Sequence, residues 1–404
     1  MPNKDKNIPK RRFKAFENAD AWELRKLGEV AEIVMGQSPD SKNYTDNPLD
    51  NILVQGNADL RDGCVVPRVW TTQVTKTAEK GDLILSVRAP VGDVGRTNYN
   101  VVLGRGVAGI KGNEFIYHLL VKMKLFGYWT KLSTGSTFES INSDDIKNST
   151  ILFPSHPEQE AIGTFFSSLD RHITLHQRKL DKLKSVKQAY LSEMFPAEGE
   201  RVPKRRFPGF TDDWELRKLG ELGTFKNGMN FSKDAMGTGF PFINLQNIFG
   251  KNVVDISQLG LAMASSIQLK NYNLQKGDVL FVRSSVKLEG VGETAIVPKN
   301  LEDTTYSGFI IRYRDSFGMD INFKRYTFGT NNIRNQIMSQ ATDSANKNIS
   351  QQVLAELDIL VPSLPEQEAI GNFFSTLDQH ITLHQRKLEK LKNLKKALLN
   401  ELFV

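Results

Sequence analysis

The 404-residue chain has a single cysteine, Cys64, and no long apolar run. One cysteine excludes a disulfide within the chain and any metal cluster held by several cysteines. Burial as a small side chain is the simplest interpretation of Cys64. No stretch approaches the 18 apolar residues of a membrane-spanning helix, and the N-terminus is too polar for a secretory signal. We therefore expect a soluble, cytoplasmic protein without membrane contact.

Catalytic motifs are missing as well. The sequence has neither the Asn/Asp-Pro-Pro-aromatic tetrapeptide of a DNA methyltransferase nor the Gly-rich loop ending in Gly-Lys-Ser/Thr that binds nucleotide phosphates. Pro39-Asp40 begins a nuclease-like pattern, but no acidic-x-Lys element follows nearby within a strand. We predict that the chain has no catalytic residue and binds no cofactor itself.

One long segment occurs twice, and such an internal repeat sets the architecture. Residues 157–195 and 365–403 match at 29 of 39 positions, with an offset of 208. Each copy opens with proline, carries glutamates in its first turn and lacks internal proline, which is typical of a helix start and an unbroken helix. At 1.5 Å per residue, each helix is expected to be roughly 58 Å long.

Apolar residues recur in both copies at alternating intervals of three and four, which is the heptad pattern of a helix that packs on another helix. The predicted seam residues are Ile162, Phe166, Leu169, Ile173, His176, Leu180, Leu183, Ile370, Phe374, Leu377, Ile381, His384, Leu388 and Leu391. Because the second helix starts from the later domain, we expect it to run back antiparallel to the first.

Shorter repeats indicate a pseudo-twofold, circular order of arm, domain and helix. Both arms contain PKRRF, and WELRKLGE occurs at residues 22–29 and 214–221. The predicted parts are an arm (1–21), a first recognition domain (22–153), a spacer helix (154–195), a linker (196–213), a second recognition domain (214–361) and a second spacer helix (362–404). The arm arginines either contact phosphate or keep the arm soluble.

The two variable domains are predicted to be α+β with small curved sheets, because short β-rich runs alternate with glycine-containing turns. One helix is expected in each, over Glu114–Leu132 and Asn322–Met338. Residues 80–97 and 276–294 resemble each other as a glycine turn, a buried strand and a loop with one arginine, which makes Arg88 and Arg283 equivalent.

Two histidine pairs, His172/His176 and His380/His384, have the i,i+4 spacing of metal ligands on one helix face. No acidic or cysteine ligand accompanies them. Because 176 and 384 are the midpoints of the two copies, these histidines are expected to meet in an antiparallel pair. A register or packing role is favoured over a metal site, and we predict none.

A net charge of +7 and a pI of about 9.2 fit a polyanionic partner. Two unlike domains on a rigid rod would read a split, asymmetric site in double-stranded DNA. Arginine suits guanine, and asparagine or glutamine suits adenine. The candidate DNA-binding residues on predicted loops are Arg88, Arg96, Arg105, Ser136, Thr137, Asn142, Asn244, Gln246, Asn247, Arg283, Ser284, Lys287, Asn346 and Lys347. For any one of them, a solvated loop side chain is the alternative.

The repeated PEQEAI helix start, the WELRKLGE entry and the Gly-Asp-strand-Arg loop resemble the specificity (S) subunit of type I restriction-modification systems. The resemblance spans both halves. It implies two target-recognition domains, an antiparallel spacer, and docking of two methyltransferase (modification) subunits that use S-adenosylmethionine. It also implies restriction (translocase-nuclease) subunits that use ATP and Mg. Rival interpretations are a two-headed protein–protein scaffold without DNA contact and, less favoured, a stand-alone nuclease or methyltransferase.

Some apolar residues of the repeat lie beside the seam and widen the apolar face beyond what one partner helix would cover. They are Phe165, Leu175, Leu191, Phe373, Leu383 and Leu399. We expect them to dock partner helices; the alternative is that the chain's own domains cover them.

Overall fold

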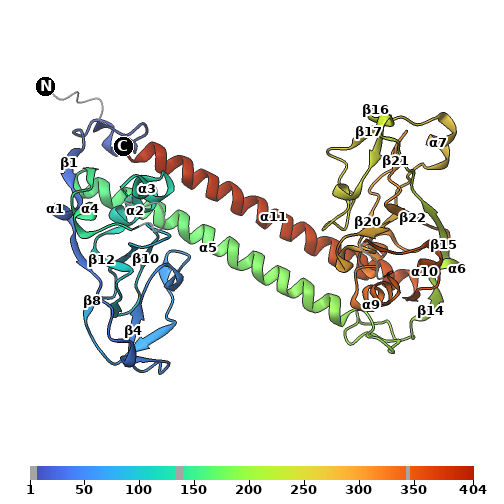
Figure 1. The fold of residues 1–404 in the computed structure, drawn as a ribbon, viewed down its shortest axis with the longest axis horizontal. Coiled ribbons are helices and arrows are strands. Elements are labelled where there is room, and N and C mark those ends of the chain that lie inside the picture. Colours follow the sequence, from blue (N-terminus) through green and yellow to red (C-terminus); the bar gives the residue numbers. More distant parts are fainter. Residues whose placement is uncertain (1–6, 133–139, 343–345) are drawn as a thin grey trace. The chain divides into compact units, whose positions relative to one another are not determined.

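The computed structural model of the chain describes residues 7–132, 140–342 and 346–404 (Figure 1). The chain divides into unit 1, comprising Met1–Arg178 and His384–Val404, and unit 2, comprising Lys179–Leu383. Each unit thus holds one β-rich domain, the first half of one long helix and the second half of the other. Among the described residues, every helix is too short or too polar to cross a lipid bilayer.

Unit 1 is built mainly from short strands. The strands are β1 (Glu23–Lys26), β2 (Glu32–Met35), β3 (Tyr44–Thr45), β4 (Asn51–Val54), β5 (Leu60–Arg61), β6 (Cys64–Val65), β7 (Val69–Thr71), β8 (Lys76–Ala78), β9 (Leu83–Ser86), β10 (Val94–Arg96), β11 (Val101–Leu103), β12 (Val107–Lys111) and β13 (Thr150–Phe153). The helices are α1 (Leu27–Val30), α2 (Glu114–Leu125), α3 (Tyr128–Leu132), α4 (Ser143–Lys147) and the long α5 (His156–Glu193).

Unit 2 repeats this plan. Its strands are β14 (Glu215–Lys218), β15 (Gly223–Asn227), β16 (Met236–Ile243), β17 (Gly260–Ala262), β18 (Val279–Val282), β19 (Ser284–Ser285), β20 (Thr294–Ile296), β21 (Thr305–Tyr306), β22 (Ile310–Asp315), β23 (Lys347–Asn348) and β24 (Asp358–Val361). Its helices are α6 (Leu219–Leu222), α7 (Ser266–Asn271), α8 (Ile321–Thr327), α9 (Asn331–Gln340), α10 (Gln351–Ala355) and the long α11 (Leu364–Leu402).

The single helix predicted in each domain is in fact two helices. In unit 1, α2 ends before Gly127, whose φ of +71° is a left-handed conformation that stops a helix, and α3 starts after it. In unit 2, the break between α8 and α9 spans Phe328–Thr330, where Phe328 is buried in the core. Helical periodicity alone did not reveal either break.

The sheets are small and mixed, which confirms the α+β prediction. Unit 1 has sheets in the orders β2-β12-β9-β10-β6-β5 and β3-β7-β4-β11-β8, and unit 2 has β15-β22-β18-β20 and β17-β16-β21. Most neighbours are antiparallel, but β4 with β11, β6 with β10, and β16 with β21 pair in parallel. The repeated WELRKLGE segment supplies one strand of a separate two-stranded sheet in each unit, β1 with β13 and β14 with β24.

An aromatic cluster holds the long helices to the domain in unit 1. Phe115 of α2 stacks on Phe403 beyond α11 with ring centroids 5.1 Å apart, and Phe166 of α5 and Trp22 also contact Phe403. Unit 2 repeats this cluster with Phe323, Phe195, Phe374 and Trp214. These side chains are buried, so the repeated residues form the common framework of both units.

The two long helices run antiparallel in unit 1. Lys395 of α11 pairs with Asp170 of α5 at 2.5 Å, and His384 meets His176 with 2.9 Å between their Nδ1 atoms. Moving forward along α5 therefore means moving backward along α11 (Figure 1). The antiparallel direction was predicted from the order of the domains along the chain, and the meeting of the two histidines from the midpoints of the repeat; both are confirmed.

The same direction holds in unit 2. Lys187 of α5 pairs with Asp378 of α11 at 2.6 Å, and one turn further along α5 the ring of Tyr190 lies 5.2 Å from that of Phe373. None of the predicted seam residues is fully exposed, and most are buried, as expected where two helices pack side by side.

The start of each long helix is locked by a buried ion pair. The Arg12 guanidinium holds the Glu158 carboxylate by two hydrogen bonds of 2.7 Å, and Arg206 holds Glu366 in the same way at 2.6 and 2.7 Å. Both glutamates are only 1% exposed. Arg12 and Arg206 thus serve the fold, contrary to both functions considered from sequence, because each lies against the carboxylate of the repeated Pro-Glu-Gln. The neighbouring Arg11 and Arg205 are exposed and pair with Glu401 and Glu193.

The glutamine of the repeated Pro-Glu-Gln forms hydrogen bonds of its own. Gln159 donates to the carbonyl of Pro154 at 2.8 Å and accepts from Asn113, the N-cap of α2. Gln367 donates to Pro362 at 2.9 Å and accepts from the backbone of Asp320, the N-cap of α8. The motif therefore fixes each long helix to the domain helix that it crosses.

Candidate functional site

Each unit has a hollow at one end of its central strands, formed by the loops that leave them. In unit 1 the hollow measures about 510 Å³ and lies beside the ends of β4 and β9 and the turn between β11 and β12. Its lining residues are Ser38, Pro39, Ser41, Tyr44, Gln55, Gly56, Asn57, Arg88, Ala89, Arg105 and Gly106. Two arginines and two amides stand in this lining without a carboxylate, so the unit 1 hollow is polar and positively charged.

Local turns present the two arginines. Arg105 lies in the Gly-Arg-Gly turn that joins β11 to β12, and its backbone N–H donates to Ser38 Oγ at 3.1 Å. Arg88 follows the buried strand β9, and its carbonyl accepts from Ser86 Oγ at 3.0 Å. Both side chains are exposed, although the backbone beneath each is fixed by hydrogen bonds. The arrangement holds two guanidinium groups at a concave edge.

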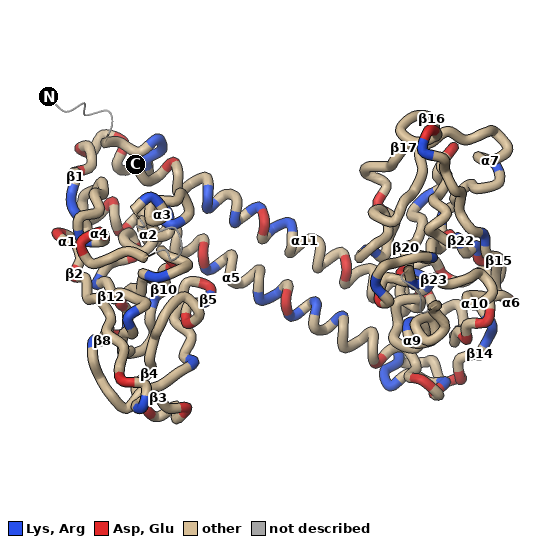
Figure 2. Tube along the Cα trace, viewed as in Figure 1, with Lys and Arg blue, Asp and Glu red and all other residues tan. Residues whose placement is uncertain are grey.

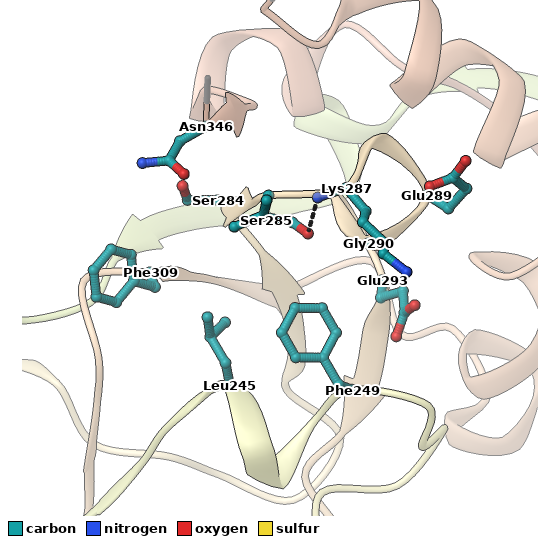
Figure 3. A pocket seen from close by; sticks show the side chains of 11 residues that line it. Leu245, Phe249, Ser284, Ser285, Lys287, Glu289, Gly290, Glu293, Phe309 and Asn346 are labelled. Carbon is teal, nitrogen blue, oxygen red and sulfur yellow. Dashed lines mark hydrogen bonds between the residues drawn. The ribbon is translucent and has the colours of Figure 1, made fainter. Parts of the chain in front are cut away.

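The hollow of unit 2 measures about 610 Å³ and is mostly apolar (Figure 3). Its lining residues are Leu245, Phe249, Ser284, Ser285, Val286, Lys287, Glu289, Gly290, Glu293, Phe309 and Asn346. Figure 3 shows Phe309, Leu245 and Phe249 facing the segment that carries Ser284 and Ser285, with Glu289 and Glu293 to one side. Phe309 is 56% exposed, which is unusual for a large apolar side chain fixed on a short turn.

Matching backbone hydrogen bonds show that the two hollows occupy the same place in the repeated fold. Val87 donates to Gly106 O and accepts from Ile141 N, whereas Arg283 donates to Phe309 O and accepts from Ile349 N. Val87 therefore corresponds to Arg283, and Gly106 corresponds to Phe309. The residues that follow Val87 and Arg283, namely Arg88 and Ser284, are equivalent in turn.

This corrects the equivalence of Arg88 and Arg283 expected from sequence. The two arginines differ by one position along equivalent strands, and neighbouring strand residues point to opposite faces. Arg283 accordingly turns away from the position of Arg88, and its Nη1 donates to the carbonyl of Gly308 at 3.4 Å. Its side chain steadies the turn that carries Phe309.

The structure sorts the predicted DNA-binding residues into several groups. Arg88 and Arg105 line the unit 1 hollow, and Ser284, Lys287 and Asn346 line the unit 2 hollow. The remaining predicted residues lie elsewhere: Gln246 is exposed after β16, Lys347 pairs with Ser285 through β23, and Ser136 and Thr137 lie outside the described residues. Their assignment as DNA contacts stays a prediction.

Arg96 belongs to the interior of unit 1 and is corrected to a structural residue. Its guanidinium donates to the Glu114 carboxylate and lies 3.3 Å from the centroid of the Tyr117 ring. Burial alone would lower the pKa of Arg96, but the hydrogen bond to Glu114 raises it. Burial alone would raise the pKa of Glu114, and the hydrogen bonds from Arg96 and Ser167 lower it. Sequence placed Arg96 on a loop, but it ends β10.

Three predicted asparagines serve local backbone structure, and of these only Asn247 is buried. Asn142 caps α4 and accepts from the backbone of Asp144 and Asp145 at 2.8 and 2.9 Å. Asn244 caps the short 3-10 turn after β16, and Asn247 is buried and donates to two carbonyls. Asparagine competes with the backbone at caps and turns, which is why residue type on a loop was a misleading signal.

Sequence reasoning did not select five residues that line the hollows. They are Gln55, Asn57 and Tyr44 in unit 1, and Phe249 and Phe309 in unit 2. Phe309 ends the turn that precedes β22, which begins at Ile310. The signal that was available is the Ser-Gly-Phe turn, which matches the Gly-Arg-Gly turn of the other half.

The predicted docking residues differ in how exposed they are. Leu175 and Leu383 are 47% and 46% exposed on the long helices, as a docking surface requires. Leu399 is 1% exposed and packed in the core of unit 1, so it is corrected to a core residue. Phe165 packs on Phe13 and Phe373 on Phe207, because the arm and the linker cover them. Leu191 is half-buried in unit 2.

The histidines form no metal centre in the described part of the chain. Within residues 7–132, 140–342 and 346–404, no three His, Cys, Asp or Glu side chains are placed to hold a metal ion together. His176 and His384 contact each other across the helix pair, with ring centroids 5.1 Å apart.

A family model and several relatives that match this chain all concern type I restriction specificity. The family model of the type I restriction modification DNA specificity domain matches twice, at residues 19–185 and 211–393. The type I restriction enzyme MjaVIII specificity subunit of Methanocaldococcus jannaschii is 21% identical over 94% of this chain and 91% of its own length. The EcoKI specificity subunit of Escherichia coli is 23% identical over 72% of this chain and 64% of its own length.

A shorter match is to a candidate specificity subunit of M. jannaschii, MjaX, which is 30% identical over 44% of this chain; the chain spans 43% of the length of that relative. Among solved structures, the type I restriction-modification S subunit from M. genitalium aligns over 98% of this chain and 99% of its own, with a TM-score of 0.63 and 17% identity. At 17% identity, this similarity shows that the two chains share a fold.

Proposed function

The chain belongs to the family of type I restriction-modification DNA specificity subunits, and from this premise we propose that it reads an asymmetric, bipartite site in double-stranded DNA. Unit 1 reads one half of the site and unit 2 reads the other. The observation that carries the proposal is the pair of hollows, which occupy the same place in two copies of one scaffold but differ in chemistry. A chain that reads two equal half-sites would not need this difference.

The two long helices set the unread gap between the half-sites in this proposal. They contain 38 and 39 residues, which correspond to roughly 57 and 58 Å of helix. Lys and Arg recur along the later half of each, interspersed with Asp and Glu (Figure 2). Lys179, Lys182, Lys387 and Lys390 are exposed there and suit contacts with the phosphates of the gap. Inserting one heptad into both helices is expected to lengthen the gap and leave both half-sites unchanged.

Leu175 and Leu383 are proposed to dock the two methyltransferase subunits. Each exposes nearly half of its side chain on a helix whose seam is already occupied, so an added helix would bury apolar surface at low cost. The chain itself supplies recognition without catalysis. S-adenosylmethionine, ATP and Mg belong to the partner subunits, which include the restriction (translocase-nuclease) subunits.

The docking proposal is tested by Leu175→Glu and Leu383→Glu, separately and together. We expect each single variant to weaken co-purification of the methyltransferase subunits and the double variant to abolish it, with thermal unfolding unchanged. Exposed Leu24 and Leu216, on the edge strands β1 and β14, supply matched controls when changed to Glu. Full assembly of the double variant would refute the docking surface.

Methylome sequencing of a host that carries the complete system tests the recognition proposal. The expected result is a motif with two different specified halves and an unspecified gap. Replacing residues 22–153 with the corresponding domain of another specificity subunit should change one half only. A continuous motif, or changes in both halves after the exchange, would contradict it.

The rival function, a two-headed scaffold without DNA contact, makes an opposite prediction for salt. A DNA-reading complex neutralises phosphates, so its affinity for duplex DNA should fall steeply between low and moderate salt. A mobility-shift titration of the reconstituted complex separates the two functions. The absence of duplex binding at low salt would favour the scaffold.

A further inference from the structure

We propose that the two hollows are the base-reading sites, and that they take different bases. The unit 1 hollow binds the major-groove edge of guanine through Arg88 and Arg105. The unit 2 hollow binds the methyl group of thymine between Phe309 and Phe249. This inference rests on the proposed function and adds to it the base chemistry that each unit reads.

The charge of the unit 1 hollow favours guanine. Several arginines of this chain lie against carboxylates, as Arg12 does with Glu158 and Arg96 with Glu114. Within the described ranges, by contrast, the side chains of Arg88 and Arg105 have no hydrogen bond or ion pair to another residue. Two exposed guanidinium groups without an acceptor among the described residues line one concavity, so both remain available to a ligand that presents hydrogen-bond acceptors.

Guanine supplies these acceptors in the right arrangement. Its O6 and N7 both face the major groove, and the planar guanidinium donates to the two at once. The amides of Gln55 and Asn57 lie in the same hollow and match the donor and acceptor of a neighbouring adenine. Phosphate is the competing ligand for free arginines, and the experiment below separates the two.

The same place in unit 2 has lost both arginines. Ser284 replaces Arg88, and Phe309 stands where unit 1 has Gly106, next to the Gly308 that replaces Arg105. Phe309 and Phe249 are both partly exposed and face a shared space (Figure 3). Of the four bases, only thymine presents a methyl group in the major groove, and phenylalanine is a side chain that contacts it.

The rest of the described unit 2 lining carries one cation, Lys287, and two carboxylates, so its charge does not favour a phosphate. Glu289 and Glu293 lie to one side of the hollow, where their charge repels phosphate, and Glu293 is held by the backbone N–H of Gly250 at 2.9 Å. Ser284 and Ser285 provide hydroxyl groups beside the phenylalanines for the polar edge of the same base pair. The occupant is thus the base-pair edge of the second half-site.

The test uses the complex of this chain with its methyltransferase subunits and duplexes that carry its methylome-defined site. Replacing single guanines of the unit 1 half with 7-deazaguanine removes the N7 acceptor. At one position or more, the wild-type complex should lose about tenfold to a hundredfold in affinity. Arg88→Ala and Arg105→Ala should show no such loss, because their contact is already gone, and Arg25→Ala, an exposed arginine of β1, is the matched control that should behave as wild type.

The parallel test of unit 2 replaces single thymines of its half with deoxyuridine, which removes only the methyl group. The wild-type complex should lose affinity by several fold to tenfold at one position, and Phe309→Ala should be insensitive to the exchange. Ile267→Ala, an exposed apolar residue of α7 that does not line the hollow, serves as its control.

Three results would overturn the inference. Arg88→Ala and Arg105→Ala could weaken all duplexes equally and reduce the salt slope, which would make them phosphate contacts. The wild-type complex could be insensitive to every 7-deazaguanine or every deoxyuridine. The wild-type motif could lack guanine in its unit 1 half or thymine in its unit 2 half. Failure of the proposed function differs from all three, since no sequence-specific binding would then be measured.

Discussion

Arg88 of unit 1 and Ser284 of unit 2 follow the same strand of the same scaffold, yet one is a free cation and the other a small hydroxyl. Around them the two units keep identical structural solutions. Trp22 and Trp214 occupy the same aromatic cluster, and Glu158 and Glu366 receive an arginine in the same way. The comparison shows that the repeat keeps the aromatic cluster and the buried ion pair at each helix start, whereas the residues at the end of the sheet, where strands give way to loops, differ in charge and polarity.

This separation has a physical reason. A buried aromatic or ion pair contacts many neighbours, so a change there costs stability, whereas an exposed loop side chain contacts few. The strand ends can therefore change their base chemistry without disturbing the framework. The most informative experiments treat equivalent positions of the two units as matched pairs.

The largest effect is expected from the buried ion pairs at the helix starts. Glu158→Gln and Glu366→Gln each leave an arginine beside a buried, uncharged partner, and the expected loss is about 3 to 5 kcal/mol in the free energy of unfolding. Urea unfolding of each variant measures it, with the exposed Glu160→Gln and Glu368→Gln of the same turns as controls. If a variant lost no more free energy of unfolding than its control, or if the loss occurred in one unit only, the two ion pairs would not be equivalent.

A second comparison concerns Leu399 and Leu191, which are equivalent in the repeat but not equally buried. Leu399→Ala should cost about 3 kcal/mol because the side chain is enclosed in the unit 1 core. Leu191→Ala should cost about 1 kcal/mol because the half-buried side chain can be replaced by water. Thermal unfolding of the two variants checks the order. Equal losses would show that the units pack this position alike.

A third comparison concerns a pH dependence of stability that a buried histidine should give to unit 1. His118 of α2 is buried, and burial with the charges of Lys395 and Arg96 lowers its pKa to about 2, although Glu114 and Asp170 lie within 4 Å. Unit 2 has Tyr326 at this position, donating to Asp378 at 2.8 Å.

Because the folded pKa of His118 lies below its unfolded value of about 6.5, the unfolded state gains a proton first as pH falls. Stability is therefore retained above pH 6.5 and lost below it, by about 2 kcal/mol at pH 5. His118→Asn should remove this part of the slope in urea unfolding measured from pH 7 to pH 5, and Tyr326→Phe should leave it in place. An unchanged slope in His118→Asn would mean that another group titrates.

The sequence by itself determined the architecture. Two copies of one amphipathic helix with a heptad seam have to bury that seam against each other, and the order of the copies along the chain makes them antiparallel. His176 and His384 could be placed in contact from their positions in the repeat alone. The α+β class followed from short β-rich runs with glycine turns, and the family followed from the repeated motifs.

The tertiary structure decided which polar side chains are free. Arg12, Arg96, Asn142 and Asn247 have the residue types of DNA contacts, but their partners are distant in sequence or lie in the local backbone, and pattern reasoning sees neither. The one-residue shift between Arg88 and Arg283 was also invisible, because the side-chain alternation of a strand is set by pairing with its neighbours. Only the hydrogen-bond register brought Arg88 and Arg105 together in one hollow and placed Phe309 at the matching position of the other.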